Sequence, residues 1–387
     1  MTDEIAIVGF GAVGRAVAAN LAARAAALRI LQRVAPPDMP AGAVFVRCDA
    51  LDGESVGRAT RGATQVVLAV GLPYLGAVWR EAWPRVMANF VDACAAIDAR
   101  LVFVDNLYMY GPQTTPLAET TPLNPVGAKP AARVEATRVW RAAAEAGRLR
   151  VAALRAPDFY GPGATQSHLG ETAFGALARG GRALIIGSPD VPHDFAYVPD
   201  FARAVVSLLD APDDAFGQAW HVPCAPTRTP REILALGAAA LGVKPRVVGL
   251  PTPLLSPLGL LVPTMRELAE MRFQWDRPYR VDFSRFAKRF WSDATPFEVG
   301  APATAWWFRD RPSLTARSAQ SRGASGQRDV FSDSIAGRIA DSSASGGFAR
   351  PSGQQSSYSA ISRPTTSHSA KAENASRKSS NDSPSGD

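Results

Sequence analysis

The chain has few of the residues from which metal sites and disulfide frameworks are built. Its 387 residues include only 3 Cys and 4 His. Cys48, Cys94 and Cys224 are far apart and show no metal-ligand spacing. We therefore expect no metal site and three free, buried thiols in a reducing compartment. No Ser-His-Asp arrangement emerges either.

Long apolar runs and export signals are also lacking. The apolar stretch 250–262 is too short to span a bilayer, and Pro251, Pro253, Pro257 and Gly259 interrupt it. The N-terminus has no basic region followed by an apolar run and a cleavage site. We expect a cytoplasmic protein without a membrane partner.

Basic charge is not concentrated in one region. The net charge is +7, and residues 311–387 carry +4 of it as 10 Lys and Arg against 6 Asp and Glu, thinly spread. The other Arg residues are scattered through Ala-rich segments and form no stripe. We expect ordinary solvated faces and no nucleic-acid partner.

The composition changes near residue 310. From Arg311 onward, 21 of 77 residues are Ser, Trp is absent, and apolar residues never recur with a helix or strand period. Such a segment cannot bury enough apolar surface to offset its ordering entropy. Residues 311–387 are therefore predicted to be a disordered Ser-rich tail.

The most informative motif lies in the first 35 residues. A short apolar strand at 4–9 leads into Gly9-Phe10-Gly11-Ala12-Val13-Gly14 and then into an Ala-rich helix without Pro. In such a unit the first glycine permits a tight turn, the second lets the backbone approach a pyrophosphate, and the third lets the helix lie close to the strand. The helix N-terminus supplies N–H groups for the phosphates. This pattern predicts dinucleotide binding.

The end of the second strand, 28–34, bears on the choice of cofactor. An acid there binds the ribose 2′-hydroxyl of NAD, whereas a basic residue suits the 2′-phosphate of NADP. Gln32 and Arg33 stand at this place, and no acid follows until Asp38. We therefore favour NADP over NAD, with Arg33 on the phosphate; the alternative is that Arg33 is a solvated strand-end residue.

Strands and helices continue to alternate up to residue 160. The pattern predicts strands at 44–47, 65–70, 101–104 and 149–154, and helices between 48 and 65, at 77–98 and at 129–146. Alternating strands and helices imply a Rossmann-type, doubly wound parallel sheet, an α/β fold whose ligands sit beyond the carboxyl ends of the strands.

The rhythm loosens after residue 160, where Pro and Gly are more frequent. We predict a dinucleotide-binding domain over 1–165, to which later segments return, and a smaller substrate-binding cap over 166–310. The cap is expected to have its own apolar clusters, which contain Trp220, Trp275, Trp291 and Trp306-Trp307.

The landmarks resemble the extended short-chain dehydrogenase/reductase superfamily, in its NAD-dependent epimerase/dehydratase group, over about residues 4–310. Beyond the glycine turn, the resemblance rests on Cys48-Asp49, Asn89, Tyr110-Gly111-Pro112, the segment from Leu154 to Gly163 and the segment from His193 to Ala204. It implies a Rossmann-fold oxidoreductase or epimerase that uses NAD(P) and acts on a carbonyl or secondary alcohol. It also suggests a homodimer through the helices at 77–98 and 129–146.

The sequence departs from this family at the catalytic positions. Members usually have Ser or Thr four residues before the Tyr of the Tyr-Gly landmark and a Tyr-x-x-x-Lys at the next helix. Here Asn106 precedes Tyr110 by four residues, and Lys129-Pro130-Ala131-Ala132-Arg133 opens the helix. Arg133 can hydrogen-bond a ribose but cannot exchange a proton. Lys129 can exchange one if burial and the cation one turn away favour its neutral form.

We therefore expect Lys129 to act as acid/base, with Asn106 positioning a carbonyl and Tyr108 as a substitute acid. The alternative is that Lys129 and Arg133 only bind cofactor phosphate or face solvent. A non-catalytic, NAD(P)-binding redox sensor is the rival function, and a nucleic-acid or scaffolding role of the tail is a third. The predicted site residues are, for catalysis, Asn106, Tyr108, Lys129 and Arg133; for cofactor, Gly9, Phe10, Gly11, Val13, Gly14, Arg33, Asp49, Ala50, Val70, Gly71, Lys129 and Pro157; and for substrate, Pro73, Tyr108, Tyr160, His193 and Tyr197.

Overall fold

The computed structural model describes residues 4–24 and 26–311, and residues 312–387 of the predicted tail lie outside them. The centre of the described part is a sheet of seven strands in the order β10-β6-β5-β4-β1-β2-β3, all parallel. The strands are β1 (Glu4–Val8), β2 (Ala27–Gln32), β3 (Val44–Arg47), β4 (Gln65–Leu68), β5 (Arg100–Asn106), β6 (Val151–Ala156) and β10 (Gln218–His221). The predicted Rossmann-type fold is confirmed.

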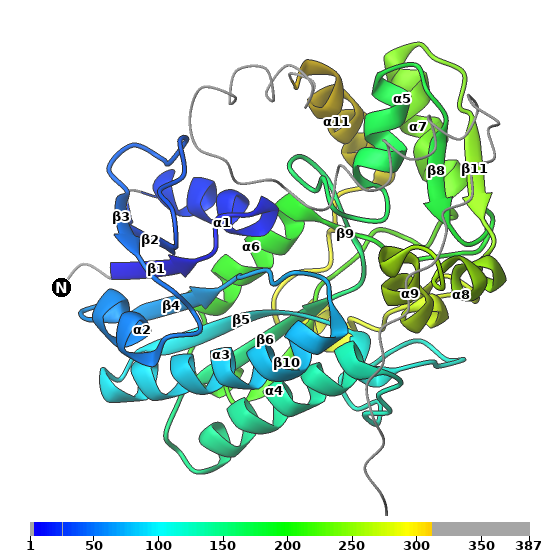
Figure 1. Cartoon of the computed structure of the whole chain (residues 1–387). Helices are drawn as coiled ribbons and strands as arrows, with labels where there is room; N and C mark the ends of the chain where they lie inside the picture. The colour runs from blue at the N-terminus through cyan, green and yellow to red at the C-terminus, as the bar shows by residue number, and fades with distance from the viewer. Residues whose placement is uncertain (1–3, 25, 312–387) are drawn as a thin grey trace, which may run out of the picture. The chain divides into compact units, whose positions relative to one another are not determined.

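Helices cover both faces of this sheet (Figure 1). One face is packed by α1 (Ala12–Ala22) and α6 (Val198–Leu209), and the other by α2 (Gly53–Thr60), α3 (Gly76–Ala96) and α4 (Ala128–Glu145). Successive side chains of a strand point to opposite faces. In β1, Ile5 and Ile7 accordingly join the α1–α6 core, and Ala6 and Val8 join the α3–α4 core. Burial on both faces explains why these strands are almost uninterrupted apolar runs.

The last strand and α6 come from the region that the sequence analysis assigned to the cap. β10 pairs with β6 in a register that sets Trp220 opposite Leu154. Trp220 is therefore buried in the α1–α6 core, and the indole of Trp291 donates to Ser207 of α6 at 3.0 Å. The expectation that Trp220 and Trp291 belong to cap clusters was wrong, because the chain returns to the sheet between residues 198 and 221.

The cap is a smaller two-layer unit. A pair of parallel strands, β8 (Ala183–Ile186) and β11 (Val247–Leu250), packs against α5 (Gly175–Ala178), α7 (Pro230–Leu241) and α11 (Phe297–Asp310). Thr229 and Glu232 form a capping box at the start of α7, and Gly242 ends that helix with φ of 69°. These local signals set the limits of the longest cap helix outside α11.

Short elements connect the cap and the sheet. The two-residue strands β7 (Phe159–Tyr160) and β9 (Ala196–Tyr197) pair in parallel, and α10 (Ser284–Arg289) packs near β10. In Figure 1, α8 (Leu255–Leu258) and α9 (Pro263–Glu270) lie below β8 and β11, on the side where α4 begins. Glu267 and Glu270 bond to the first residues of α3 and α4, so α9 stands near the carboxyl ends of the central strands.

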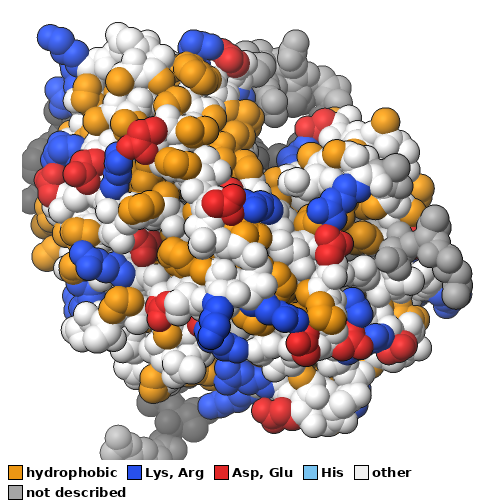
Figure 2. Space-filling model, turned by 180° about the vertical axis from the view of Figure 1, so that it is seen from behind, with side chains coloured by type: hydrophobic (Ala, Val, Ile, Leu, Met, Phe, Trp, Pro, Cys, Tyr) orange, Lys and Arg blue, Asp and Glu red, His pale blue; other side chains and the backbone are white. Residues whose placement is uncertain are grey.

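Several simpler expectations concern the described residues as a whole. Cys48, Cys94 and Cys224 are free and buried, as predicted. Within residues 4–24 and 26–311, no helix combines the length and apolar character that a membrane crossing requires. Figure 2 shows Lys and Arg side chains interspersed with Asp and Glu over the back face of the molecule.

Candidate functional site

The Gly9–Gly14 turn joins β1 to α1. Gly9 has φ of 88°, and a Cβ on it would lie 2.7 Å from the carbonyl oxygen of Ala69. A Cβ on Gly14 would lie 2.1 Å from the carbonyl oxygen of Gly9. Beside Gly11, no atom of the described residues comes within 4 Å of such a Cβ. Two glycines therefore close the turn onto the sheet, while the third leaves backbone open to a phosphate at the N-terminus of α1.

The carboxyl end of β2 carries no acid. Gln32 uses its side-chain oxygen to accept a hydrogen bond from the N–H of Phe10 at 3.2 Å, so a neutral amide supports the glycine turn. Arg33 follows it and is exposed. Asp38, the next acid, forms an ion pair with Arg15. This end of the sheet thus presents an exposed basic side chain and no acid directly after the strand.

The loop after β3 is tied to α3. Asn89 donates to the carbonyl oxygen of Ala50 at 2.9 Å, and Asp49 accepts from the N–H of Leu51 at 3.0 Å while remaining exposed. These bonds hold Asp49 and Ala50, two predicted cofactor residues, at the same edge as the glycine turn. Of the other predicted cofactor and substrate residues, Val13 and Pro157 are buried, Val70 is half-buried, and Gly71 and Pro73 are exposed.

A buried ion-pair network lies behind this edge. Asp105, near the end of β5, accepts from Arg133 Nη1 and from Arg155 Nε, both at 3.1 Å. The guanidinium carbon of Arg133 lies 3.6 Å from the ring centroid of Trp83, and burial lowers the pKa of Arg133 to about 10. Arg133 is therefore a core cation in this structure, and its predicted contact with a ribose stays a prediction.

The network continues across β6 to β10. Arg155 donates to the hydroxyl of Tyr110 at 2.8 Å and to Thr137 at 3.0 Å, and the Tyr110 hydroxyl lies 3.0 Å from His221 Nε2. Burial, and secondly the charge of Arg155, lower the pKa of His221 to about 3. Tyr110 is fully buried here. We call Asp105, Arg133, Arg155, Tyr110 and His221 the inner cluster.

Lys129 lies one turn before Arg133 but faces a different element. Its Nζ donates to Glu267 at 2.6 Å and to Glu270 at 2.8 Å, and it lies 4.8 Å from the ring centroid of Tyr74. The side chain is fully buried. The alternative that Lys129 faces solvent is therefore wrong. Arg133 was expected to act on Lys129, but it pairs with Asp105, so the charges nearest to Lys129 are two carboxylates.

Tyr108 and Asn106 lie between these clusters. The amide oxygen of Asn106 accepts from the N–H of Tyr108 at 3.1 Å, and the Tyr108 ring stacks on Trp79 with centroids 5.9 Å apart. Burial, and then the charge of Asp158, raise the pKa of Tyr108 to about 12. Tyr108 is thus a phenol that keeps its proton at neutral pH, which suits a donor better than a base.

A His–Asp pair faces the cap side of the site. His193 is buried with Nε2 3.3 Å from Asp158 Oδ2, and the same oxygen accepts the indole N–H of Trp275 at 3.1 Å. Burial alone would raise the pKa of Asp158, but His193 and His168 hold it below its ordinary value. The His168 ring stacks on Trp275 with centroids 5.4 Å apart, and burial lowers its pKa to about 4.

Two of the predicted substrate residues lie in the cap core. Tyr160 is 1% exposed and its ring packs against Tyr197 and Phe297. A Cβ on Gly300 would lie 2.4 Å from the Tyr160 hydroxyl oxygen, so the phenol is enclosed. Tyr160 is therefore enclosed in this structure and its contact with substrate stays a prediction, as does that of Tyr197, which is buried beside it.

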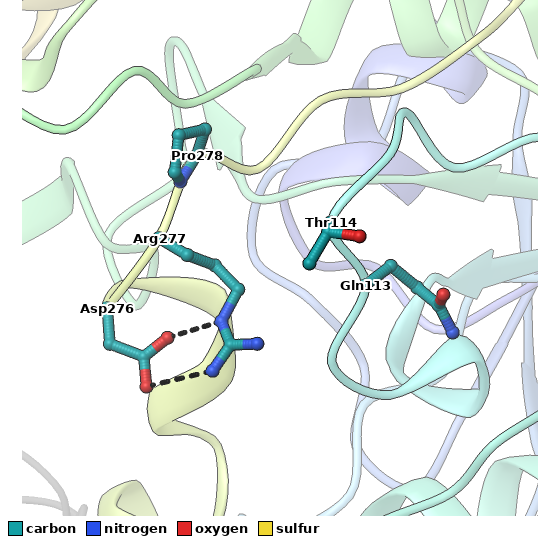
Figure 3. Close-up of a pocket in the computed structure, with 5 residues that line it drawn as sticks. All are labelled: Gln113, Thr114, Asp276, Arg277 and Pro278. Carbon is teal, nitrogen blue, oxygen red and sulfur yellow. Dashed lines mark hydrogen bonds and ion pairs between the residues drawn. The ribbon is translucent and has the colours of Figure 1, made fainter.

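A surface hollow of about 310 Å³ lies between two loops near the site. Figure 3 shows its five lining residues, Gln113, Thr114, Asp276, Arg277 and Pro278, with Arg277 donating to Asp276 at 2.7 Å. The first loop follows Tyr108–Tyr110 and the second follows Trp275. The two loops that line the hollow therefore directly follow Tyr110 and Trp275 along the chain.

Sequence reasoning missed the residues that complete the site. Asp158 was quoted only as part of a landmark, and Glu267, Glu270 and Trp275 were not connected to it at all. The two acids are three positions apart on α9, a spacing that is common on solvated helix faces. Only the fold brings them to Lys129.

The model of the NAD dependent epimerase/dehydratase family matches residues 5–222. This match spans more than half of the chain, so the chain belongs to that family. A comparison with curated protein sequences finds no match.

Solved structures share the fold at low sequence identity. A double mutant of dTDP-glucose 4,6-dehydratase from Streptomyces venezuelae, with NAD and DAU bound, is 20% identical with a TM-score of 0.64, and the match covers 79% of this chain and 97% of that one. For UDP-glucose 4-epimerase from Thermus thermophilus, complexed with NAD, the values are 20%, 0.62, 80% and 100%. For UDP-glucuronic acid 4-epimerase from Bacillus cereus, complexed with NAD, they are 15%, 0.62, 79% and 98%.

Proposed function

We propose that this chain binds a nicotinamide dinucleotide across the carboxyl ends of β1 and β2 and catalyses hydride transfer at a carbonyl or secondary-alcohol carbon. The observation that carries this proposal is the Gly9–Gly14 turn, in which Gly9 and Gly14 admit no Cβ and Gly11 faces open space. That combination is what the approach of a pyrophosphate to the N-terminus of α1 requires.

NADP is the favoured cofactor, with NAD as the alternative. Gln32 is neutral and occupied with Phe10, and Arg33 is exposed beside it. An arginine suits a 2′-phosphate, whereas an acid suits a free 2′-hydroxyl. The similar structures named above contain NAD, which keeps NAD in the experiment as the comparison ligand.

We assign the chemistry to Lys129 and to three further residues, Tyr108, Asn106 and His193. A bound nicotinamide supplies or accepts the hydride. As an ammonium, Lys129 donates a proton to the substrate oxygen when an alcohol forms, and as an amine it takes the proton back in the reverse direction. Tyr108 is the second candidate donor, Asn106 positions the carbonyl, and His193 is proposed to contact substrate.

The rival function is a non-catalytic redox sensor that binds NAD(P). One observation favours it, since Lys129 already donates to Glu267 and Glu270 and is fully buried. A sensor would keep that arrangement when the nucleotide binds, whereas an enzyme must release Lys129 to its substrate.

Nucleotide binding tests the proposal. We expect Gly14→Ala to abolish binding of NADPH and NADH in a fluorescence titration, because its Cβ would lie 2.1 Å from the Gly9 carbonyl oxygen. Gly57→Ala is the matched control, since open space surrounds that position in α2. Arg33→Gln should weaken NADPH by about tenfold, the effect of losing one charged contact, and leave NADH unchanged. Equal effects on both nucleotides would remove the preference for NADP.

A further inference from the structure

Two helices that begin at the ligand edge of the sheet have their first N–H groups bound by a third helix. The N–H of Gly76, which opens α3, donates to Glu267 at 2.8 Å, and the N–H of Lys129 in α4 donates to Glu270 at 2.6 Å. The same carboxylates bind Lys129 Nζ. Two acids of α9 thus satisfy N–H groups that helices leave free, at the positive ends of two helix dipoles.

The chain leaves room for these carboxylates by placing glycine at the start of both helices. Gly127, immediately before α4, has φ of 98°, and a Cβ on it would lie 2.4 Å from Glu270 Cγ. A Cβ on Gly76 would lie 3.4 Å from the Glu270 carboxylate and 3.1 Å from Ala128. The contact is therefore a close fit of Glu267 and Glu270 to the backbone of the sheet domain.

Few apolar side chains hold α8 and α9 in place. No residue of α9 is buried, although Leu268 packs partly buried against Met271, Phe273 and Trp275, and α8 buries only Leu255. Leu260 and Leu261, between the two helices, are 86% and 83% exposed. A Cβ on Gly259 would lie 2.8 Å from the Cα of Arg266, so α8 and α9 rest directly on each other. Segments with few buried contacts are those that open locally at low cost.

The chain is anchored again directly after α9. Met271, Phe273 and Trp275 are buried and form their own apolar cluster with Tyr74 and Tyr108 around it. Burial thus changes after Glu270, from a helix without buried residues to a buried cluster. Any motion of α8 and α9 would therefore end at this junction.

We propose that residues 255–270 are a lid over the site, latched shut by Glu267 and Glu270. With the latch closed, the ammonium of Lys129 is fully buried and donates to both carboxylates, so no substrate oxygen reaches it. Opening frees Lys129 together with the N-termini of α3 and α4. The proposal rests on the proposed function only for the role of Lys129 in the reaction, and the latch itself is tested without any ligand.

The chain offers a direct measure of the latch, because Lys244 and Lys288 are exposed and Lys129 is not. Reductive methylation of the full chain, followed by mass spectrometry, reports each lysine separately. In the wild type we expect Lys129 to react at least about tenfold more slowly than Lys244. In Glu267→Ala/Glu270→Ala it should approach the Lys244 rate, whereas Glu81→Ala, an exposed acid on α3, should behave as wild type.

Hydrogen exchange at single-residue resolution distinguishes a lid from general loosening. The double variant should exchange the N–H groups of Gly76 and Lys129 at least about tenfold faster, while β5 keeps its protection. Lys129 that stays unreactive in the double variant would overturn the proposal. Faster exchange of β5 to the same extent would overturn it as well, because α9 would then be part of the global fold. Neither result depends on whether the chain binds a nucleotide.

Discussion

Lys129 and Arg133 lie one turn apart on α4, yet they belong to two clusters of charged residues that differ in burial. The inner cluster draws Asp105, Arg133 and Arg155 from α4 and two strands of the sheet, with Asp105 and Arg155 set opposite each other in the register of β5 and β6. The Asp105 and Arg155 side chains are fully buried. At Lys129, by contrast, Glu267 and Glu270 keep 16% and 18% of their side-chain exposure and belong to a helix with no buried residue.

This difference agrees with the proposal that Lys129 is the acid/base of the reaction, and it gives Arg133 a structural partner in Asp105. Arginine keeps its charge at any physiological pH, so Arg133 and Arg155 remain cations beside the buried carboxylate of Asp105. Lysine can exchange a proton, and Lys129 lies at the edge of the sheet, under a segment held by polar contacts. Lys129 and Arg133 thus retain the spacing of the family's usual Tyr-x-x-x-Lys pair. Their side chains, however, contact different parts of the molecule.

The largest expected effect is on the inner cluster. Asp105→Asn leaves two buried guanidinium groups without their anion, and should lower the free energy of unfolding by about 3–5 kcal/mol. Urea denaturation measures it. Asp92→Asn, which removes an ion pair with Arg148 whose side chains are 71% and 56% exposed, should change stability by about 0.5 kcal/mol or less. Similar losses of stability in Asp105→Asn and Asp92→Asn would show that the buried cluster is no more important for folding than an exposed ion pair.

A second effect is the response of the inner cluster to acid. Burial and Arg155 lower the pKa of His221 to about 3 from its ordinary 6.5. Below pH 6.5 this histidine binds a proton in the unfolded chain but not in the folded chain. The contribution of His221 to the free energy of unfolding is therefore complete above pH 6.5 and is lost as the pH falls toward 3. The loss is about 1.4 kcal/mol per pH unit. His221→Gln should remove one proton from the slope of stability against pH between 6 and 4.

The slope, and not the stability at one pH, is the quantity to compare, because His221→Gln also loses contacts with Tyr110. His168, whose pKa burial lowers to about 4, contributes a similar slope that the variant retains. A slope identical to that of the wild type would show that His221 is protonated in the folded chain.

The smallest expected effect on stability is at Lys129. Lys129→Met should lower the free energy of unfolding by about 2 kcal/mol, less than Asp105→Asn, because Glu267 and Glu270 keep partial solvation and the N-termini of α3 and α4. Lys244→Met is the exposed control and should be neutral. A loss as large as that of Asp105→Asn would mean that Lys129 belongs to the structural core, and would blur the distinction between the two clusters.

Local patterns predicted the sheet domain well. The glycine turn, the alternating strands and helices and the Lys129–Arg133 spacing depend on neighbours in the sequence, and the structure has the turn, the sheet and the helix where they were expected. The partners of Lys129 could not be predicted in this way, because Glu267 and Glu270 are 138 and 141 residues away. No periodicity specifies which distant acid meets a buried lysine.

A return of later segments to the sheet domain was expected, but local patterns could not specify which segment returns. β10 is only four residues long, and it is a strand of the main sheet because β6 has a free edge beside it. Trp220 therefore looked like a cap residue in the sequence. In the same way, Tyr160 follows a strand at the ligand edge, but its side chain points into the cap core, which only the packing of Phe297 and Gly300 against it reveals.

The most direct test of the account follows the absorbance of reduced nicotinamide while carbonyl compounds are titrated into the protein with NADPH or NADH. The account predicts oxidation of NADPH with one class of carbonyl by the wild type, and none by Lys129→Met, at NADPH concentrations that saturate both proteins. Full turnover in Lys129→Met would contradict the assigned role of Lys129. Tight binding without oxidation by the wild type, whatever the carbonyl, would contradict the hydride transfer itself and favour the redox sensor.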